Sequence, residues 1–209
     1  GLYRNVHVIV TENAHIPVWG TYVTTPTATK EFAKVNVRTQ IVLLEGADAG
    51  KYSVKTSVWN PNGQKLTEQT IPLSQIKYND NSLSQEFIIQ TPTLWSPDMP
   101  ALYSAETRLY EGDQLKDIYT TPFGIRSIEI IPNKGFFLNG EKTVFKGVCN
   151  HHDLGPLGAA VNDAAIRRQI RILKDMGCNA IRTSHNMPAP ELVRACDEMG
   201  MMLMVESFD

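Results

Sequence analysis

The stretch NDAAIRRQIRILKDMGCNAIRTSHN, residues 162–186, decides the architecture of the second half of the chain. Asn162 is a natural helix N-cap, apolar residues recur at helical spacing from Ile166, and Gly177 closes the helix. A short strand is expected directly afterwards, at Asn179–Thr183. A helix that leads straight into a strand is typical of a crossover between parallel strands.

The segments on both sides of this stretch extend the same pattern. A hairpin is expected at Asn139-Gly140, which supplies the two φ > 0 positions of a type I′ turn, and a strand that leads into Cys149–Asp153 follows it. A second helix is expected from Pro190 to Gly200, and then a strand at Met201–Val205 that is apolar on both faces, as in a sheet covered by helices. This order predicts a doubly wound sheet or a (β/α)₈ barrel, and the lack of a glycine-rich phosphate loop favours the barrel. Three strands cannot close a barrel, so we expect the chain to end within the fold.

The first half, from about Val18 to Ile130, alternates between apolar and polar residues. Such alternation puts one face of each strand on a core. The runs lie near residues 35–43, 52–58, 67–73, 85–90, 103–110 and 116–121, with turn signals such as Asn60–Gly63 and Asn79–Asn81 between them. We predict an immunoglobulin-like β-sandwich, with Trp59 as its buried strand tryptophan. A further strand is expected at Asn5–Thr11.

Composition excludes several classes of protein. The 209 residues are 42% hydrophobic and 20% charged with a formal net charge of -2, which argues against disordered, collagen-like and disulfide-scaffold chains. The sequence has no basic patch of the kind that would predict nucleic-acid binding. No apolar run approaches the ~20 residues that a membrane helix needs. The three cysteines, Cys149, Cys178 and Cys196, are expected to be buried thiols.

Polar residues collect where each strand of the second half ends. The three strands lead into Cys149–Asp153, Arg182–Asn186 and Glu206–Asp209, which together hold three of the five histidines. In α/β barrels the carboxyl ends of the strands converge on one mouth, where the active site lies. These segments are therefore predicted to form a site.

Several motifs resemble those of a known enzyme family. Asn179–Asn186, followed by Cys196–Gly200, resembles the signature stretch of glycoside hydrolase family 2. Met187 stands where the family would have proline, and Val205-Glu206 replaces its usual Asp-Glu pair. Motifs similar to the family's jelly-roll, immunoglobulin-like and barrel domains follow in the family's order, at Gly1–Arg4, Leu94–Pro97 with Phe123–Arg126, and Phe137–Val148.

The resemblance implies a division into three parts. Residues 1–15 would be the tail of a jelly-roll domain and a linker, residues 16–128 an immunoglobulin-like sandwich, and residues 129–209 the first part of a (β/α)₈ barrel. Family members are retaining glycosidases, and the match is best to the β-galactosidases, with β-glucuronidase and β-mannosidase as alternatives. The two catalytic glutamates are expected beyond residue 209, so the isolated chain is expected to be inactive.

The resemblance also assigns roles to site residues. His151 and His185 would hydrogen-bond sugar hydroxyls, and Arg182 would keep the nucleophilic glutamate ionised. Asp153 and Glu206 are further substrate-binding candidates. The expected partner is a β-linked galactoside or oligosaccharide, with no nucleic acid, membrane, metal or cofactor. We also expect self-association through the incomplete barrel, in a bacterial cytoplasm or periplasm.

Two rival interpretations remain at this point. A metal hydrolase could use His151, His152, Asp153 and His185, although adjacent histidines chelate one ion poorly and there is no His-x-x-x-His pair. Otherwise His152 is expected to be a loop or interface residue. A non-catalytic carbohydrate-binding or scaffold module would stack sugars on aligned aromatic side chains, whereas the three tryptophans Trp19, Trp59 and Trp95 are scattered.

Overall fold

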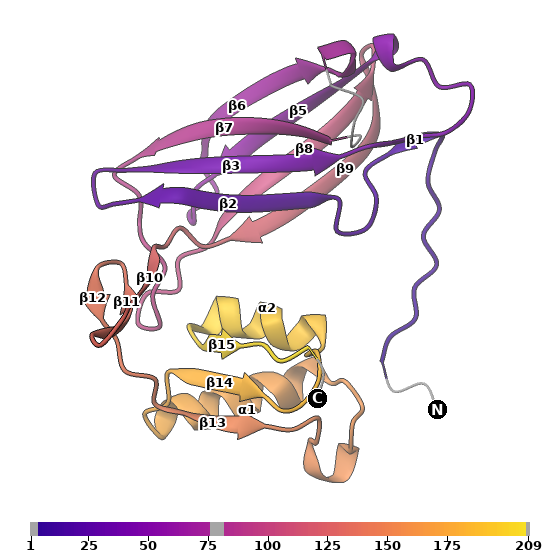
Figure 1. Ribbon diagram of the computed structural model, residues 1–209. Helices are drawn as coiled ribbons and strands as arrows, with labels where there is room; N and C mark the ends of the chain where they lie inside the picture. The colour runs from indigo at the N-terminus through magenta and orange to yellow at the C-terminus, as the bar shows by residue number, and fades with distance from the viewer. Residues whose placement is uncertain (1–3, 76–81, 208–209) are drawn as a thin grey trace. The chain divides into compact units, whose positions relative to one another are not determined.

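The computed structural model describes residues 4–75 and 82–207, which form two compact units (Figure 1). The sandwich unit comprises residues 9–94 and 102–127, and the barrel unit comprises residues 1–8, 95–101 and 128–209. The predicted turn at 79–81 and the chain ends at 1–3 and 208–209 lie outside the described residues. Within the described ranges, none of the helices has the length and apolar character needed to cross a bilayer.

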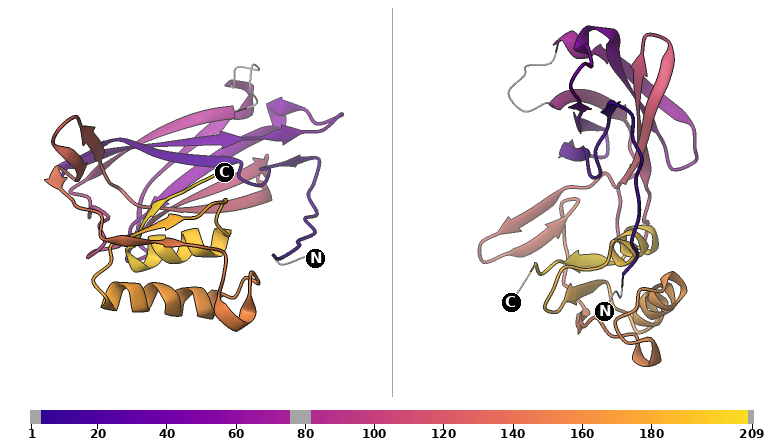
Figure 2. Two further views of the ribbon diagram at one scale, coloured as in Figure 1. Left: turned by 60° about the horizontal axis from the view of Figure 1, so that its bottom comes forward. Right: turned by 90° about the vertical axis from the view of Figure 1, so that its right-hand side faces the viewer.

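The sandwich unit is built from two antiparallel sheets, as the alternating pattern predicts (Figure 2). The first sheet has the order β2-β3-β7 and the second β6-β5-β8-β9, with a short β1-β4 pair beside them. The strands are β1 Ala14–His15, β2 Thr21–Ala28, β3 Phe32–Gln40, β4 Val42–Leu43, β5 Tyr52–Trp59, β6 Lys65–Pro72, β7 Ser82–Gln90, β8 Tyr103–Glu111 and β9 Gln114–Phe123. The prediction of an immunoglobulin-like domain is confirmed.

The sandwich core comes from the inward positions of these strands. Val35 and Val37 of β3 pack in one apolar cluster with Val58 of β5, and all three are fully buried. A polar bridge crosses the core, where Thr56 donates a 2.6 Å hydrogen bond to Gln85, which in turn donates to the backbone of β6. Because these polar groups are buried, their mutual hydrogen bonds are needed to replace the hydrogen bonds to water that are lost on folding.

Two expectations for the first half are wrong. Trp59 is only half-buried, whereas the deeply buried tryptophan is Trp95, which is 3% exposed and belongs to the barrel unit. Residues 5–11 form no strand, and Val8 is 91% exposed. An alternating pattern becomes a strand only when another strand accepts its hydrogen bonds, and no described residue pairs with this segment.

The barrel unit contains a parallel sheet with the order β13-β14-β15. Its elements are β13 Gly147–Asn150, α1 Asp163–Asp175, β14 Ala180–Thr183, α2 Pro190–Met199 and β15 Met202–Met204, preceded by a small sheet of β10 Ile128–Ile131, β11 Gly135–Leu138 and β12 Glu141–Lys142. Short 3₁₀ turns lie at Ala49–Lys51, Leu73–Gln75 and Gly155–Leu157. This is the start of a TIM barrel, and the sheet does not close among the described residues.

Local signals set the ends of these elements. Asn162 caps α1 by accepting a hydrogen bond from the Ala165 amide at 3.0 Å. The Asn139-Gly140 turn has φ values of 53° and 79°, as a type I′ turn requires. Gly200 ends α2 at φ 72°, and a Cβ there would lie 2.2 Å from the Pro97 carbonyl oxygen. Glycine is therefore required at this position for both its conformation and its lack of a side chain.

The two faces of the parallel sheet differ, which corrects the prediction for the last strand. Ile181 is 1% exposed and packs with α1 and α2, so one face is covered by helices. On the other face Met204 is 57% exposed, whereas we expected this strand to be covered on both faces. Cys149 is also exposed, so the expectation of a buried thiol is wrong there, although Cys196 is buried.

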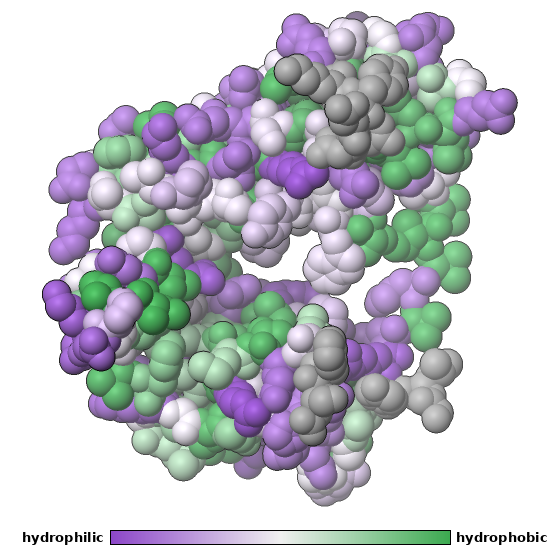
Figure 3. All heavy atoms as spheres, viewed as in Figure 1, coloured by the Kyte–Doolittle hydropathy of each residue, from purple (hydrophilic) through white to green (hydrophobic). Residues whose placement is uncertain are grey.

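Large apolar side chains also lie at the surface of the barrel unit. Figure 3 shows hydrophobic atoms in patches on this unit. The exposed residues include Ile128, Ile130, Val144, Phe145, Met187 and Met204.

Candidate functional site

Strand register brings the candidate residues to one face of the parallel sheet. Cys149 of β13 pairs with Arg182 of β14, and Arg182 pairs with Met204 of β15. Because the strands are parallel and in register, these three side chains project from the same face, opposite the helices. The segments that follow the strands therefore start from the same edge, as the sequence predicts.

Arg182 is the centre of the resulting cluster. One guanidinium nitrogen, Nη2, donates a 2.8 Å hydrogen bond to Glu206 Oε1. The other, Nη1, donates to Ser184 Oγ at 3.1 Å and lies 3.5 Å from Cys149 Sγ. Arg182 is thereby held by three polar groups, and its fork is fixed in orientation.

These contacts change the acid–base properties of two groups. The hydrogen bond from Arg182 lowers the pKa of the Cys149 thiol, because the cation stabilises the thiolate. The same contact with Cys149, followed by the charge of Glu206, raises the pKa of Arg182. The guanidinium therefore stays charged across the whole working range of pH.

The two candidate histidines adjoin this ion pair. His185 Nδ1 lies 3.4 Å from Glu206 Oε1. The rings of His185 and His151 meet edge to face, with centroids 5.4 Å apart. The peptide bond between Ser184 and His185 is cis. Contacts thus run without a break from Arg182 through Glu206 and His185 to His151, and we call these four residues the rim cluster.

Glu206 has a more central position than its sequence context indicated. Its backbone amide donates to Thr183 Oγ1 at 3.0 Å, and its Oε1 atom serves both Arg182 and His185. Its second oxygen, Oε2, is buried and has no hydrogen-bond partner among the described residues. Buried carboxylate oxygens normally accept hydrogen bonds, so Oε2 has unused acceptor capacity in this structure.

Comparison with known proteins assigns the chain to a family. The model for "Glycosyl hydrolases family 2" matches residues 14–126, and the model for its TIM barrel domain matches residues 129–208. The chain belongs to glycosyl hydrolase family 2. The resemblance found in the sequence motifs is confirmed.

Relatives in family 2 carry more than one name. The chain is 43% identical to "Beta-galactosidase BoGH2A" of Bacteroides ovatus, over all of this chain and 24% of that protein. It is 35% identical to a "Putative beta-glucuronidase" of Formosa agariphila, over all of this chain and 19% of that protein. A solved family 2 structure from Bacteroides cellulosilyticus superposes with a TM-score of 0.92 at 37% identity, over 99% of this chain and 28% of that one. The chain thus spans about a quarter of the length of the relatives it matches.

The two remaining polar residues of the first loop have local partners in this family 2 chain. Asp153 is exposed, and its Oδ1 accepts a 2.8 Å hydrogen bond from the Gly155 amide, which shapes the loop. His152 is partly buried, and its Nε2 lies 3.1 Å from the Met187 carbonyl oxygen. No contact joins either residue to Arg182 or Glu206 among the described residues.

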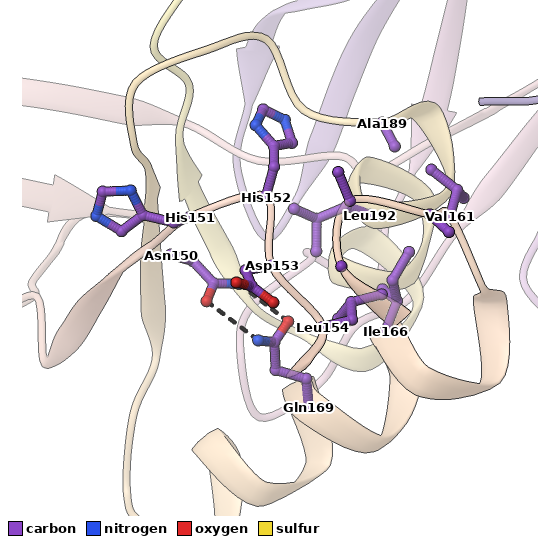
Figure 4. A pocket seen from close by; sticks show the side chains of 13 residues that line it. Asn150, His151, His152, Asp153, Leu154, Val161, Ile166, Gln169, Ala189 and Leu192 are labelled. Carbon is purple, nitrogen blue, oxygen red and sulfur yellow. Dashed lines mark hydrogen bonds between the residues drawn. The ribbon is translucent and has the colours of Figure 1, made fainter. Parts of the chain in front are cut away.

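A small cavity of about 50 Å³ lies behind the same loop, and Figure 4 shows it. Its wall is mainly apolar, from Leu154, Ile166 and Leu192, with an amide pair of Asn150 and Gln169 at one side. Ligand pockets usually enclose several hundred Å³, so this cavity is too small to hold a sugar by itself. It lies beside the loop that carries His151, whose ring points away from it in Figure 4.

The histidines and acids of this family 2 site are not arranged as a metal centre. Across residues 4–75 and 82–207, there is no group of three His, Cys, Asp or Glu side chains that could hold an ion. The rim cluster contains one carboxylate, Glu206, which is already paired with Arg182. The formal charges of the guanidinium and the carboxylate cancel within this pair.

Proposed function

We propose that this chain supplies part of the sugar-binding rim of a retaining β-glycosidase that hydrolyses terminal β-D-galactosides. The observation that carries the proposal is the rim cluster, in which Arg182, Glu206, His185 and His151 are in contact where parallel barrel strands end. Family 2 membership supports the reaction class, and the 43% identical relative named a β-galactosidase supports the sugar.

Each member of the rim cluster has a distinct role in the proposal. His151 and His185 exchange hydrogen bonds with sugar hydroxyls, since an imidazole can donate at one nitrogen and accept at the other. Glu206 accepts a hydroxyl hydrogen at its carboxylate, because an ionised carboxylate is an acceptor with several lone pairs. Arg182 fixes Glu206 and presents positive charge toward a catalytic carboxylate. Asp153 has a lesser role at the outer edge of the rim, by shaping the loop that carries His151.

The catalytic carboxyl pair is assigned to neither Glu206 nor Asp153. A retaining glycosidase needs two carboxyl groups about 5–5.5 Å apart, one as acid/base and one as nucleophile. The rim cluster has one carboxylate, and its Oε1 is bound to Arg182. We therefore expect the two catalytic glutamates outside these 209 residues, and the isolated chain to lack turnover.

The charge of the site favours galactosides over glucuronides. Arg182 and Glu206 carry opposite charges that cancel within the cluster. The carboxylate of a glucuronide would add a negative charge beside Glu206 and would need a further cation, which the rim cluster does not supply. β-Glucuronidase is the alternative, because the relative that is 35% identical carries that name.

The test uses the enzyme that contains this chain, assayed with nitrophenyl β-galactoside, β-glucuronide and β-mannoside. We expect the highest kcat/KM with the galactoside. His185→Ala should lower that kcat/KM about 10- to 100-fold, because the loss of a hydrogen bond to a substrate hydroxyl costs on the order of 1.5–3 kcal/mol.

The matched control is His15→Ala, which removes a histidine of the sandwich unit whose Nδ1 contacts the Glu12 carbonyl oxygen. The control should leave kcat/KM unchanged. The proposal is wrong if the glucuronide or mannoside is the best substrate, or if His185→Ala behaves like the control.

A further inference from the structure

We propose that Arg4 is a positioning residue that joins the loop of His151 to the loop of His185. The inference rests on the proposed function, because it gives those two histidines their role. Arg4 lies 148 positions before His152 in the sequence, yet its Nη2 lies 3.0 Å from His152 Nε2. The same Nη2 donates a 2.9 Å hydrogen bond to the Met187 carbonyl oxygen.

The positions of these two partners give the contact its significance. His152 is the residue directly after His151, and Met187 is two residues after His185. One Arg4 nitrogen therefore contacts a residue within two positions of each of the two proposed sugar-binding histidines. Any change in the distance between the loops would change the 5.4 Å spacing of the His151 and His185 rings.

The chemistry of the guanidinium fixes the state of His152. A guanidinium nitrogen donates hydrogen bonds and accepts none, so His152 Nε2 must act as the acceptor. Where Nε2 accepts, the ring carries its hydrogen on Nδ1. Nη2 carries two hydrogens, which allows one nitrogen to serve both His152 Nε2 and the Met187 carbonyl oxygen.

Without Arg4 these two acceptors would face each other. His152 Nε2 and the Met187 oxygen lie only 3.1 Å apart. Two acceptors at that distance either separate, or the histidine moves its proton to Nε2 and donates to the carbonyl. We therefore expect that removal of Arg4 changes the tautomer of His152 or increases the separation of the two loops.

The next residue provides a matched control. Asn5 donates a 3.1 Å hydrogen bond from Nδ2 to Glu191 Oε1, in the first turn of α2. Asn5→Ala removes a contact between the same segment and α2, within the barrel unit, but leaves the His152 and Met187 contacts intact. A difference in kcat/KM between the Arg4 and Asn5 variants therefore reports on the contacts of Arg4 with the two loops.

The kinetic experiment measures kcat/KM of the enzyme that contains this chain, on nitrophenyl β-galactoside. Arg4→Ala should lower kcat/KM about 10- to 100-fold, mainly through KM, because a misplaced binding group weakens substrate orientation. Arg4→Lys should retain most of the activity, since an ammonium group can also donate to both acceptors. Added guanidinium ion should partly restore Arg4→Ala, and Asn5→Ala should resemble the unchanged enzyme.

A second readout does not depend on activity. Nitrogen NMR of the 209-residue chain labelled with [¹⁵N]histidine, at about pH 8.5 where imidazoles are neutral, should show His152 as the Nδ1–H tautomer. The signal is assigned by its loss in His152→Gln. Arg4→Ala should convert it to the Nε2–H tautomer or to a mixture of both.

The outcomes separate the two proposals. An Nε2–H tautomer in the unchanged chain, or equal kcat/KM for Arg4→Ala and Asn5→Ala, would overturn the role of Arg4. An unchanged enzyme that hydrolyses none of the glycosides would overturn the proposed function alone, and the tautomer would still decide whether Arg4 makes the bridge.

Discussion

At the scale of single residues, the site depends on long-range contacts that the sequence shows only in part. The motif around Arg182 and His185 and the positions of the strand ends predict that these side chains lie together, and both of them contact Glu206. Glu206 is more central than its sequence motif indicates, because it contacts Arg182, 24 positions earlier, only once β14 and β15 pair side by side. The bridge made by Arg4 gave no local signal, since its partners lie far along the chain.

The exposed thiol offers a direct test of the charge around Arg182. Because Arg182 lowers the pKa of Cys149, the reactive thiolate should be present at a lower pH than for an ordinary cysteine. Burial raises the pKa of Cys196 to about 12, so that thiol should stay unreactive. Iodoacetamide at pH 7.5–8 should label Cys149 first, as mass spectrometry of the peptides would show.

The variant Arg182→Met is the comparison for this measurement. It should move the midpoint of the rate–pH profile of Cys149 to higher pH, since the cation that stabilises the thiolate is gone. An unchanged midpoint would show that Arg182 does not contact the thiol in solution.

At the scale of elements, local signals predicted most of the helices, turns and strands. Helix caps and turns are determined by neighbouring residues, as at Asn162, Gly177 and Asn139-Gly140. They can therefore be predicted without knowledge of the fold. The prediction of a strand at 5–11 is wrong for the opposite reason. A strand forms only with a hydrogen-bonding partner strand, which the local sequence does not identify. The predicted burial of Trp59 is also wrong, since it depends on which distant residues pack over the side chain.

Gly200 gives a stability test at this scale. Gly200→Ala should lower the free energy of unfolding of the barrel unit by about 1–3 kcal/mol, because alanine is strained at φ 72° and its Cβ would meet the Pro97 carbonyl oxygen. The matched control is Gly63→Ala in the sandwich unit, at φ 76° with open space around it. Gly63→Ala should lower the free energy of unfolding by less than Gly200→Ala, because only the backbone strain remains. Equal losses in urea unfolding would contradict the close approach at Gly200.

At the scale of the whole molecule, the parallel sheet presents one covered face and one face with exposed apolar residues. Met204 and Val205 are about half exposed, and Ile130 of the small sheet is 77% exposed. Burial of such surface is favourable by roughly 25 cal/mol per Å². Self-association of the isolated chain, or cover of this face by a neighbour, therefore stays a prediction.

We propose that Glu206, His151 and His185 bind the hydroxyl groups of one sugar. A crystal structure of the enzyme that contains this chain, soaked with galactose, tests it most directly. We expect a galactose hydroxyl within about 2.5–3.0 Å of a Glu206 carboxylate oxygen, and further hydroxyls within hydrogen-bond distance of the two histidine rings. A galactose bound elsewhere, with no hydroxyl on Glu206 or on the two histidines, would show that these residues do not bind the sugar.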